Sequence, residues 1–170
     1  PIVRQNLDLG PFKFRSDRFP NRELLNEVNR ADGWCHAKKT QPIWARRLSA
    51  AQSVSTQEGI LDAKAGDYLC RGPAGELWPQ SAKTLESKYE PTEITEPDGW
   101  RKFTPRPDGA GVEAAPIHHD FTVRATWGEL KGKPGDYLVK NATDCGVRYP
   151  DDTWIVSRSI FQATYEIAAR

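Results

Sequence analysis

A sixteen-residue pattern occurs twice in this chain, and it limits the possible folds more than any other feature. The first copy covers residues 54–69 and the second covers residues 123–138, at an offset of 69 residues with no gap. Eight of the sixteen positions are identical, in the frame V-x4-G-x-L-x2-K-x-G-D-Y-L. A repeat at this spacing predicts two similar structural units, each built around one copy.

The repeat continues beyond this frame with aromatic residues at matching distances. Trp78 lies eleven residues before Tyr89, and Trp154 lies eleven residues before Tyr165. Between the Tyr of the frame and this Trp, the second copy is longer by seven residues (seventeen positions against ten). Length variation confined to one place is typical of a surface loop. We therefore predict an exposed, extended hairpin at residues 141–153.

The composition before and between the copies divides the chain into four segments. Residues 91–116, between the copies, carry five prolines and three glycines, a composition that favours an extended, semi-rigid linker. The predicted segments, in chain order, are an N-terminal segment with one helix at 1–39, a first module at 40–90, a Pro-rich linker at 91–116 and a second module at 117–170.

Local patterns predict mostly short strands. Brief alternations of apolar and polar residues, punctuated by Gly and Pro, are typical of strands joined by tight turns. One helix is predicted from Pro20 to about Arg30, with Leu24, Leu25 and Val28 as its buried stripe. We therefore predict an α+β, β-rich fold made of two tandem small rolled-sheet or barrel modules with a short N-terminal helix.

The Gly-Asp-Tyr turn at the end of each copy is explained by turn chemistry. Its Gly supplies a positive φ, and the carboxylates of Asp67 and Asp136 are expected to accept hydrogen bonds from nearby backbone N–H groups. The alternative is that both carboxylates face one cleft and form the site of an enzyme together with His119. Near the end of the chain, Ser159 and Gln162 predict a capping box over a one-turn helix.

Composition limits the class of partner. The chain has 170 residues, with 38% hydrophobic residues and six Trp, six Phe and five Tyr, which is enough for an aromatic core. Its net charge is only +1, which argues against nucleic acid as the partner. No apolar run approaches the roughly 20 residues of a membrane span, and residues 1–20 lack a signal-peptide core. A cytoplasmic location with no membrane partner is therefore predicted.

The chemistry-bearing residues do not form a known metal or nucleophile pattern. His118-His119-Asp120, together with Cys35-His36 and Cys145, supplies metal-ligand types, but adjacent residues of a strand point to opposite faces. A Cys145 and His119 nucleophile pair would require the hairpin to fold back. The three widely spaced cysteines are expected to be free thiols. We therefore expect no metal and no cofactor.

Aromatic residues interleaved with basic ones offer an alternative function. Such a pattern can stack nucleobases, which would make the chain a nucleotide or single-strand binding protein, although aromatics in strands more often belong to a core. The residues concerned are Trp44, Arg46, Arg47, Arg148, Tyr149 and Trp154.

Both copies share further residues with a known family. The first copy carries Glu58-Gly59, Ala65-Gly66-Asp67-Tyr68, Gly75-Glu76-Leu77-Trp78-Pro79 and Tyr89-Glu90. The second carries Pro134-Gly135-Asp136-Tyr137, Trp154, Phe161 and Tyr165-Glu166, but lacks the Gly-Glu before its Trp. These residues resemble the PGDYG family of small proteins and domains from bacteria and their phages. The family has no established activity, so the resemblance implies a fold and not a reaction.

These observations predict a non-catalytic binding or accessory protein with an unknown small-molecule or protein partner. Residues that the two copies do not share are the best candidates for contacts, because a duplicated module keeps what folding requires and diverges where it is used. Arg and Tyr are also frequent at binding hot spots. The predicted binding residues are His118, His119, Arg148, Tyr149, Asp151 and Asp152. The alternatives are the enzyme with Asp67, Asp136 and His119, and the nucleotide or single-strand binding protein.

Overall fold

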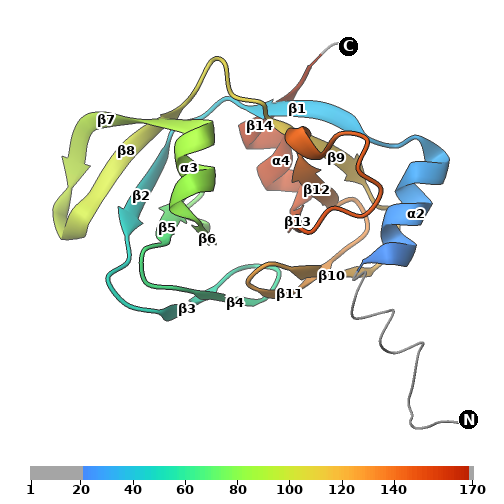
Figure 1. Ribbon diagram of the computed structural model, residues 1–170, viewed down its shortest axis with the longest axis horizontal. Coiled ribbons are helices and arrows are strands. Elements are labelled where there is room, and N and C mark those ends of the chain that lie inside the picture. Colours follow the sequence, from blue (N-terminus) through green and yellow to red (C-terminus); the bar gives the residue numbers. More distant parts are fainter. Residues whose placement is uncertain (1–20, 169–170) are drawn as a thin grey trace, which may run out of the picture.

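The computed structural model describes residues 21–168 and contains two open five-stranded sheets (Figure 1). The first sheet has the strand order β6-β5-β2-β8-β7, and the second has the order β13-β12-β9-β1-β14. Neighbouring strands are antiparallel throughout both sheets. The β-rich prediction is therefore confirmed, while the barrel alternative is wrong, because no sheet in residues 21–168 closes on itself.

The strands of the two sheets are short, as the alternating patterns predict. Those of the first sheet are β2 (Ile43–Arg47), β5 (Tyr68–Arg71), β6 (Leu77–Gln80), β7 (Tyr89–Glu96) and β8 (Trp100–Pro105). Those of the second sheet are β1 (Cys35–Lys39), β9 (Val112–Pro116), β12 (Tyr137–Asn141), β13 (Thr153–Val156) and β14 (Tyr165–Ile167). Single 3-10 turns occur at η1 (Pro97–Gly99) and η2 (Ala142–Asp144).

Each sheet, together with a two-stranded hairpin and a short helix, forms one half of the molecule. The hairpins are β3 (Gln52–Ser55) with β4 (Ile60–Ala63), and β10 (Phe121–Ala125) with β11 (Gly128–Gly132). The helices are α3 (Ala82–Lys88) and α4 (Arg158–Thr164). Both helices begin at a serine cap: the side chain of Ser81 accepts from the N–H of Thr84, and Ser157 accepts from Ile160. The capping box predicted at Ser159 and Gln162 is wrong, because Ser157 caps the helix two residues earlier.

The predicted linker is part of both sheets. Residues 91–116 contribute most of β7, the whole of β8 and the whole of β9. The prolines do not prevent this pairing because they occupy positions that tolerate a missing N–H donor. Pro91 lies in the edge strand β7, and Pro105 and Pro116 are the last residues of their strands.

Strand β1 completes the second sheet from the N-terminal side of the chain. It pairs with β9 on one side and with β14 on the other. In the first sheet the corresponding place, between β2 and β7, is taken by β8, which follows β7 directly in the chain. The segment predicted as a separate N-terminal piece at 1–39 therefore supplies an inner strand of the second sheet.

Helix α2 (Arg22–Ala31) packs on the second sheet. Its buried residues Leu25 and Val28 join the core cluster that contains Ile117 and Leu138. The predicted start at Pro20 lies outside the described residues, and Asn21 ties the start of the helix to β10 by accepting from the N–H of Arg124 at 2.6 Å. The predicted helix and its buried stripe are confirmed, although Leu24 is only partly buried.

The two hairpins join the halves of the molecule through a reciprocal pair of hydrogen bonds (Figure 1). The N–H of Asp62 donates to the carbonyl of Trp127 at 2.9 Å, and the N–H of Lys131 donates to the carbonyl of Glu58 at 2.8 Å. Asp62 and Lys131 are 69 positions apart, as are Glu58 and Trp127, so each bond is the repeat equivalent of the other. This junction connects the two halves of the molecule at the hairpins.

Two further findings concern the predictions of location and of the thiols. No helix among residues 21–168 combines the length and apolarity needed to cross a membrane. All three cysteines are free, as predicted: Cys70 is buried, Cys35 is half-buried and Cys145 is exposed.

Candidate functional site

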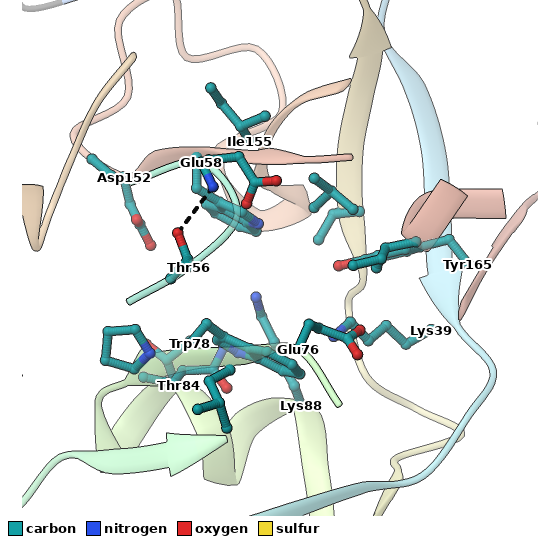
Figure 2. Close-up of a pocket in the computed structure, with 18 of the residues that line it drawn as sticks. Lys39, Thr56, Glu58, Glu76, Trp78, Thr84, Lys88, Asp152, Ile155 and Tyr165 are labelled. Atoms are coloured by element: carbon teal, nitrogen blue, oxygen red, sulfur yellow. Dashed lines mark hydrogen bonds between the residues drawn. The ribbon is translucent and has the colours of Figure 1, made fainter. Parts of the chain in front are cut away.

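A cavity of about 160 Å³ lies between the two halves of the molecule (Figure 2). We call it the central cavity. It is lined by residues of β6 and α3 on one side, by residues of β13, α4 and β14 on the other, and by residues of the two hairpins. Apolar side chains supply much of the lining, among them Leu61, Ala125, Trp127, Leu130 and Ile155. Such a concave, largely apolar surface with a few polar groups is the usual form of a ligand-binding site.

The aromatic residues of the repeat face this cavity from both halves. Trp78 of β6 and Trp154 of β13 line it, as do Tyr89 and Tyr165, which follow α3 and α4 directly. Burial raises the pKa of both phenols well above the ordinary value, so both hydroxyl groups remain protonated. The four residues that extend the repeat beyond its sixteen-residue frame therefore converge on one space.

Two lysine side chains reach the same cavity and rest on these rings. The Nζ atom of Lys39, the last residue of β1, lies 4.1 Å from the centroid of the Trp78 ring and 5.5 Å from that of Tyr165. The Nζ atom of Lys88, the last residue of α3, lies 4.8 Å from the centroid of the Trp154 ring. An ammonium group over an aromatic face is attracted by the ring quadrupole. Figure 2 shows the amino group of Lys88 directed into the open space.

Neither amine is neutralised by a neighbour. Within residues 21–168, Lys39 and Lys88 form no ion pair and no hydrogen bond through their side chains. Burial lowers the pKa of Lys39 to about 8, and the charge of Lys88 adds to this effect. Burial likewise lowers the pKa of Lys88 to about 8. The negative charge of Asp152 opposes the shift of Lys88 and that of Glu76 opposes the shift of Lys39, but the loss of water is the larger effect for both amines.

Three carboxyl groups also line the cavity, and two of them have partners. Glu76 accepts from the N–H of Ala74 at 2.9 Å, and Asp152 accepts from the side chain of Asn141 at 2.9 Å. Glu58 lies in the turn between β3 and β4, and its pKa is raised to about 7 by burial and by the negative charge of Asp136. Near neutral pH, Glu58 is therefore present in both its protonated and its ionised forms.

The two aspartates of the repeat turns do not belong to the cavity lining. Asp67 accepts from the N–H of Lys64 at 3.0 Å, and Asp136 accepts from the N–H of Lys133, also at 3.0 Å. These bonds are equivalent in the two copies, so the predicted role of both aspartates in their turns is confirmed. Asp67 also accepts from the indole N–H of Trp127 at 3.2 Å, and thereby links the two halves. The structure thus gives both carboxylates hydrogen-bond donors, and neither aspartate lines the cavity.

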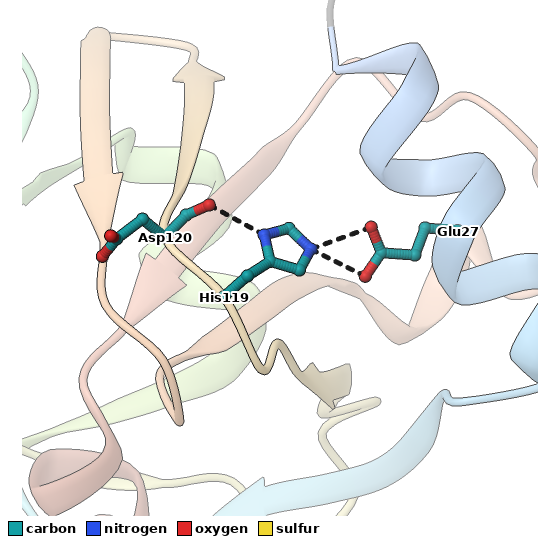
Figure 3. Close-up of polar contacts among 3 residues, drawn as sticks. All are labelled: Glu27, His119 and Asp120. Atoms are coloured by element: carbon teal, nitrogen blue, oxygen red, sulfur yellow. Dashed lines mark hydrogen bonds and ion pairs between the residues drawn. The ribbon is translucent and has the colours of Figure 1, made fainter.

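His119 lies at the contact with helix α2 and away from the cavity lining (Figure 3). Its Nε2 atom lies 2.9 Å from both carboxylate oxygens of Glu27, and its Nδ1 atom lies 2.7 Å from the carbonyl oxygen of Asp120. Both ring nitrogens face acceptors, which suits the doubly protonated ring. The pKa of His119 is raised, first by the bond to the Asp120 carbonyl and then by Glu27. His118 is exposed.

The predicted hairpin at 141–153 is exposed at six of its thirteen residues, while Pro150 and Thr153 are buried. Two of its candidate binding residues have internal partners. The hydroxyl group of Tyr149 donates to Asn26 of α2 at 2.9 Å, and Arg22 lies over its ring at 5.4 Å. Asp152 accepts from Asn141 and from the hydroxyl of Thr126. Arg148 and Asp151 are exposed. Of the six predicted binding residues, only Asp152 lines the central cavity.

The predicted nucleobase-stacking residues separate into different places. Trp44 and Arg46 lie on β2. The Cζ atom of Arg71, on the neighbouring strand β5, lies 5.6 Å from the ring centroid of Trp44 and 4.6 Å from that of Trp100. Arg47 instead lies over Tyr68 at 5.5 Å. Trp154 faces the central cavity, and Arg148 and Tyr149 belong to the hairpin. The pattern therefore does not form one continuous surface.

The residues that give the cavity its charge were not identified from the sequence. Lys39 and Lys88 belong to no motif, and Glu58 and Glu76 were noted only among the residues that resemble the PGDYG family, which implies a fold and not a site. The matched spacing of Trp and Tyr in the two copies is the sequence feature that leads to the cavity, but it was interpreted only as an extension of the structural repeat. Among residues 21–168 no group of three or more His, Cys, Asp or Glu residues is arranged to hold a metal ion.

Comparisons with known proteins do not identify the chain. No protein-family model, no curated protein and no solved structure matches it.

Proposed function

We propose that this protein binds a small molecule in the central cavity and carries out no reaction on it. The observation that carries this proposal is the convergence of Trp78, Trp154, Tyr89 and Tyr165 from the two halves on one concave, partly apolar space. Buried aromatic surface supplies much of the energy of ligand binding. A cavity of this kind at the junction of two sheets is also where ligands commonly bind.

The proposal includes the origin of the two halves as copies of one duplicated module, similar to the PGDYG family. It is supported by the matching strand orders of the two sheets and by the reciprocal hydrogen bonds between the hairpins. The equivalent turn bonds of Asp67 and Asp136 support it as well. In this proposal β1 takes, in the second module, the place that β8 has in the first. The resemblance to the PGDYG family and the cytoplasmic location stay predictions.

The binding proposal accounts for the geometry better than the alternative enzyme does. That enzyme needs Asp67, Asp136 and His119 around one cleft. Each of these residues has a partner elsewhere, and none lines the central cavity. A nucleophile or a general base is expected to lie within hydrogen-bond reach of its partner in one site.

The test uses a neutral, apolar fluorescent probe, N-phenyl-1-naphthylamine, whose emission rises when it leaves water. We expect saturable binding to the protein. Ile160 of α4 lines the cavity and is half-buried, so Ile160→Trp fills the space and is expected to abolish the signal. Ile94→Trp is the matched control, because Ile94 is 53% exposed and lies outside the lining. Equal binding by both variants, or no binding by the wild type, would show that the cavity is not the site.

A further inference from the structure

The charged residues of the binding site differ in whether another residue forms an ion pair or a hydrogen bond with them. Seven charged residues line the central cavity: Lys38, Lys39, Glu58, Glu76, Lys88, Arg106 and Asp152. Four of them are engaged by neighbouring groups. Lys38 donates to the carbonyl of Pro107, Arg106 donates to Glu90 and to the carbonyl of Glu86, and Glu76 and Asp152 accept the hydrogen bonds described above.

Within residues 21–168, three of the seven have no ion pair and no side-chain hydrogen bond to another residue, and two of these three are the amines of Lys39 and Lys88. The third is Glu58, whose pKa is raised to about 7, so that its negative charge is only partial near neutral pH. Figure 2 shows Glu58 across the space from Trp78 and Lys88. The amines are close enough for the charge of Lys88 to lower the pKa of Lys39. A partly neutral Glu58 repels an incoming anion less than a fully ionised carboxylate does.

Two like charges held in one cavity with only partial compensation are costly for the free protein. Asp152 raises the pKa of Lys88 and Glu76 raises that of Lys39, but burial lowers both pKa values by more. The flexible side chains of the two lysines are fixed on the rings of Trp78 and Trp154, which attract ammonium groups but do not neutralise them. A ligand with two negative charges removes this cost when it binds. A phosphate monoester fits best, because it carries close to two negative charges at neutral pH and presents three acceptor oxygens. A carboxylate supplies only one charge.

On these grounds we propose that the ligand is a phosphate monoester with an apolar body, whose phosphate contacts Lys39 and Lys88 and whose body packs on Leu61, Leu130 and Ile155. This inference rests on the proposed function, since it names the class of ligand for the same cavity. The apolar walls exclude free phosphate as the preferred ligand because it would leave them without a contact. A lysine amine binds phosphate as a point charge, so the site sets the charge of the ligand more strictly than its orientation.

The experiment compares four probes by calorimetry at pH 7: 1-naphthyl phosphate, 1-naphthoate, 1-naphthol and inorganic phosphate. The first three share one ring and differ only in the head group. We expect 1-naphthyl phosphate to bind at least about tenfold more tightly than 1-naphthol, since one charge-assisted contact is worth at least that factor. Affinity for 1-naphthoate is expected to be intermediate, and inorganic phosphate is expected to bind more weakly than the ester.

Variants assign the effect to the two amines. Lys39→Met and Lys88→Met are each expected to lower the affinity for 1-naphthyl phosphate by about tenfold or more, the loss expected for one charged contact. Binding of 1-naphthol should change little, which also shows that the variants are folded. Lys83→Met is the matched control, because Lys83 lies on the same helix as Lys88 but is exposed and does not line the cavity.

The outcomes separate the two proposals. If 1-naphthol binds as tightly as 1-naphthyl phosphate, or if both lysine variants keep the full preference for phosphate, the phosphate-monoester inference is wrong and small-molecule binding remains. If inorganic phosphate binds as tightly as the ester, the apolar body is not recognised and the inference is also wrong. If neither the naphthyl probes nor N-phenyl-1-naphthylamine binds, the proposed function itself fails.

Discussion

Gly59 and Gly128 lie at equivalent places in the two hairpins, and each faces a backbone carbonyl of the other hairpin. A Cβ atom on Gly59 would lie 2.6 Å from the carbonyl oxygen of Glu129, and one on Gly128 would lie 2.8 Å from that of Ile60. No side chain fits at these distances. The glycine that both copies share therefore permits the close contact that joins the two halves.

We expect Gly59→Ala and Gly128→Ala each to destabilise the protein by about 1–3 kcal/mol, the usual range for overpacking against a fixed neighbour. Urea unfolding followed by tryptophan fluorescence measures this loss. Gly33→Ala is the control, because the added Cβ would meet its nearest atom at an ordinary 3.6 Å. Its effect should stay within about 0.5 kcal/mol of the wild type. A similar loss in all three variants would mean that the hairpin contact is not the cause.

The turn aspartates give a second test of the architecture. Asp67→Ala and Asp136→Ala should each cost about 1–2 kcal/mol, since each removes an acceptor from a buried or capped backbone N–H. Asp67 also holds the indole of Trp127, so Trp127→Phe should reproduce part of the Asp67→Ala loss and add little to it. A double-mutant cycle by urea unfolding measures this coupling. Strict additivity would show that the bond between the halves contributes nothing.

The sequence predicted the parts of the structure that depend on local patterns. The helix at α2, the turns around Asp67 and Asp136, and the presence of a longer connection at 141–153 follow from periodicity, turn chemistry and length variation. The place of β1 does not, because a strand's partners are set by contacts far along the chain. The run from Cys35 to Lys39 has one fully buried residue, Ala37, and no local feature that assigns it to the second sheet.

The same reason explains why the sequence indicated only part of the site. The matched Trp and Tyr positions were found because the two copies share them. Lys88 stands before Tyr89, but Thr164 stands before Tyr165, so the repeat does not mark the lysine. Most lysines in a sequence are exposed, and only the fold shows that Lys39 and Lys88 meet in one cavity. The unshared residues of 117–120 and 141–153 instead include Tyr149 and His119, which contact α2.

The hairpin at 141–153 is therefore expected to matter for stability as well as for any recognition. A surface loop, as the sequence predicts here, is expected to tolerate shortening to the length of the first hairpin. The structure leads to a different expectation, because Tyr149 bonds to Asn26 and Arg22 covers its ring. Shortening should expose α2 and increase amide hydrogen exchange at Leu25 and Val28. A helix as protected as in the wild type would show that Tyr149 contributes little to its packing.

Glu58 makes the stability of the protein depend on pH in a predictable direction. Its folded pKa is about 7, against 4.5 for an ordinary glutamate, so the folded protein holds this proton more tightly than the unfolded chain. Its contribution is fully present below pH 4.5 and is lost as the pH rises through 7. Glu58→Gln should remove this loss and stabilise the protein at pH 8 by about 1 kcal/mol, after allowance for solvent screening.

The measurement is the difference in unfolding free energy between wild type and Glu58→Gln at several values of pH from 4.5 to 8. Taking the difference cancels the titration of other groups. Glu129→Gln is the control, because Glu129 is exposed and lies outside the cavity. A difference that stays constant across this range, or one that favours the wild type as pH rises, would contradict the prediction.

The two cavity lysines should make stability depend on pH in the opposite direction from Glu58. They should also lower the stability of the free protein while they strengthen ligand binding. Each has a folded pKa of about 8 against 10.5 for an ordinary lysine, so the unfolded chain binds more protons between these values. Stability contributed through these groups therefore rises as the pH increases from 8 to 10.5. At pH 7 both amines are charged in the folded protein at full cost. Lys39→Met and Lys88→Met should stabilise the free protein at pH 7 by about 1–3 kcal/mol, and this gain should shrink as the pH approaches 10.5.

A gain in stability that accompanies a loss of phosphate-ester binding would explain why two incompletely compensated charges are present. Residues that bind a ligand are often not those that stabilise the free protein best. The check is urea unfolding of both variants at pH 7 and pH 10, with and without 1-naphthyl phosphate. The wild type should gain stability from the ester at pH 7 and much less at pH 10, where its amines are largely neutral. Lysine variants less stable than the wild type at pH 7 would show that the amines have stabilising partners. That result would contradict the prediction that the charge of each amine destabilises the free protein.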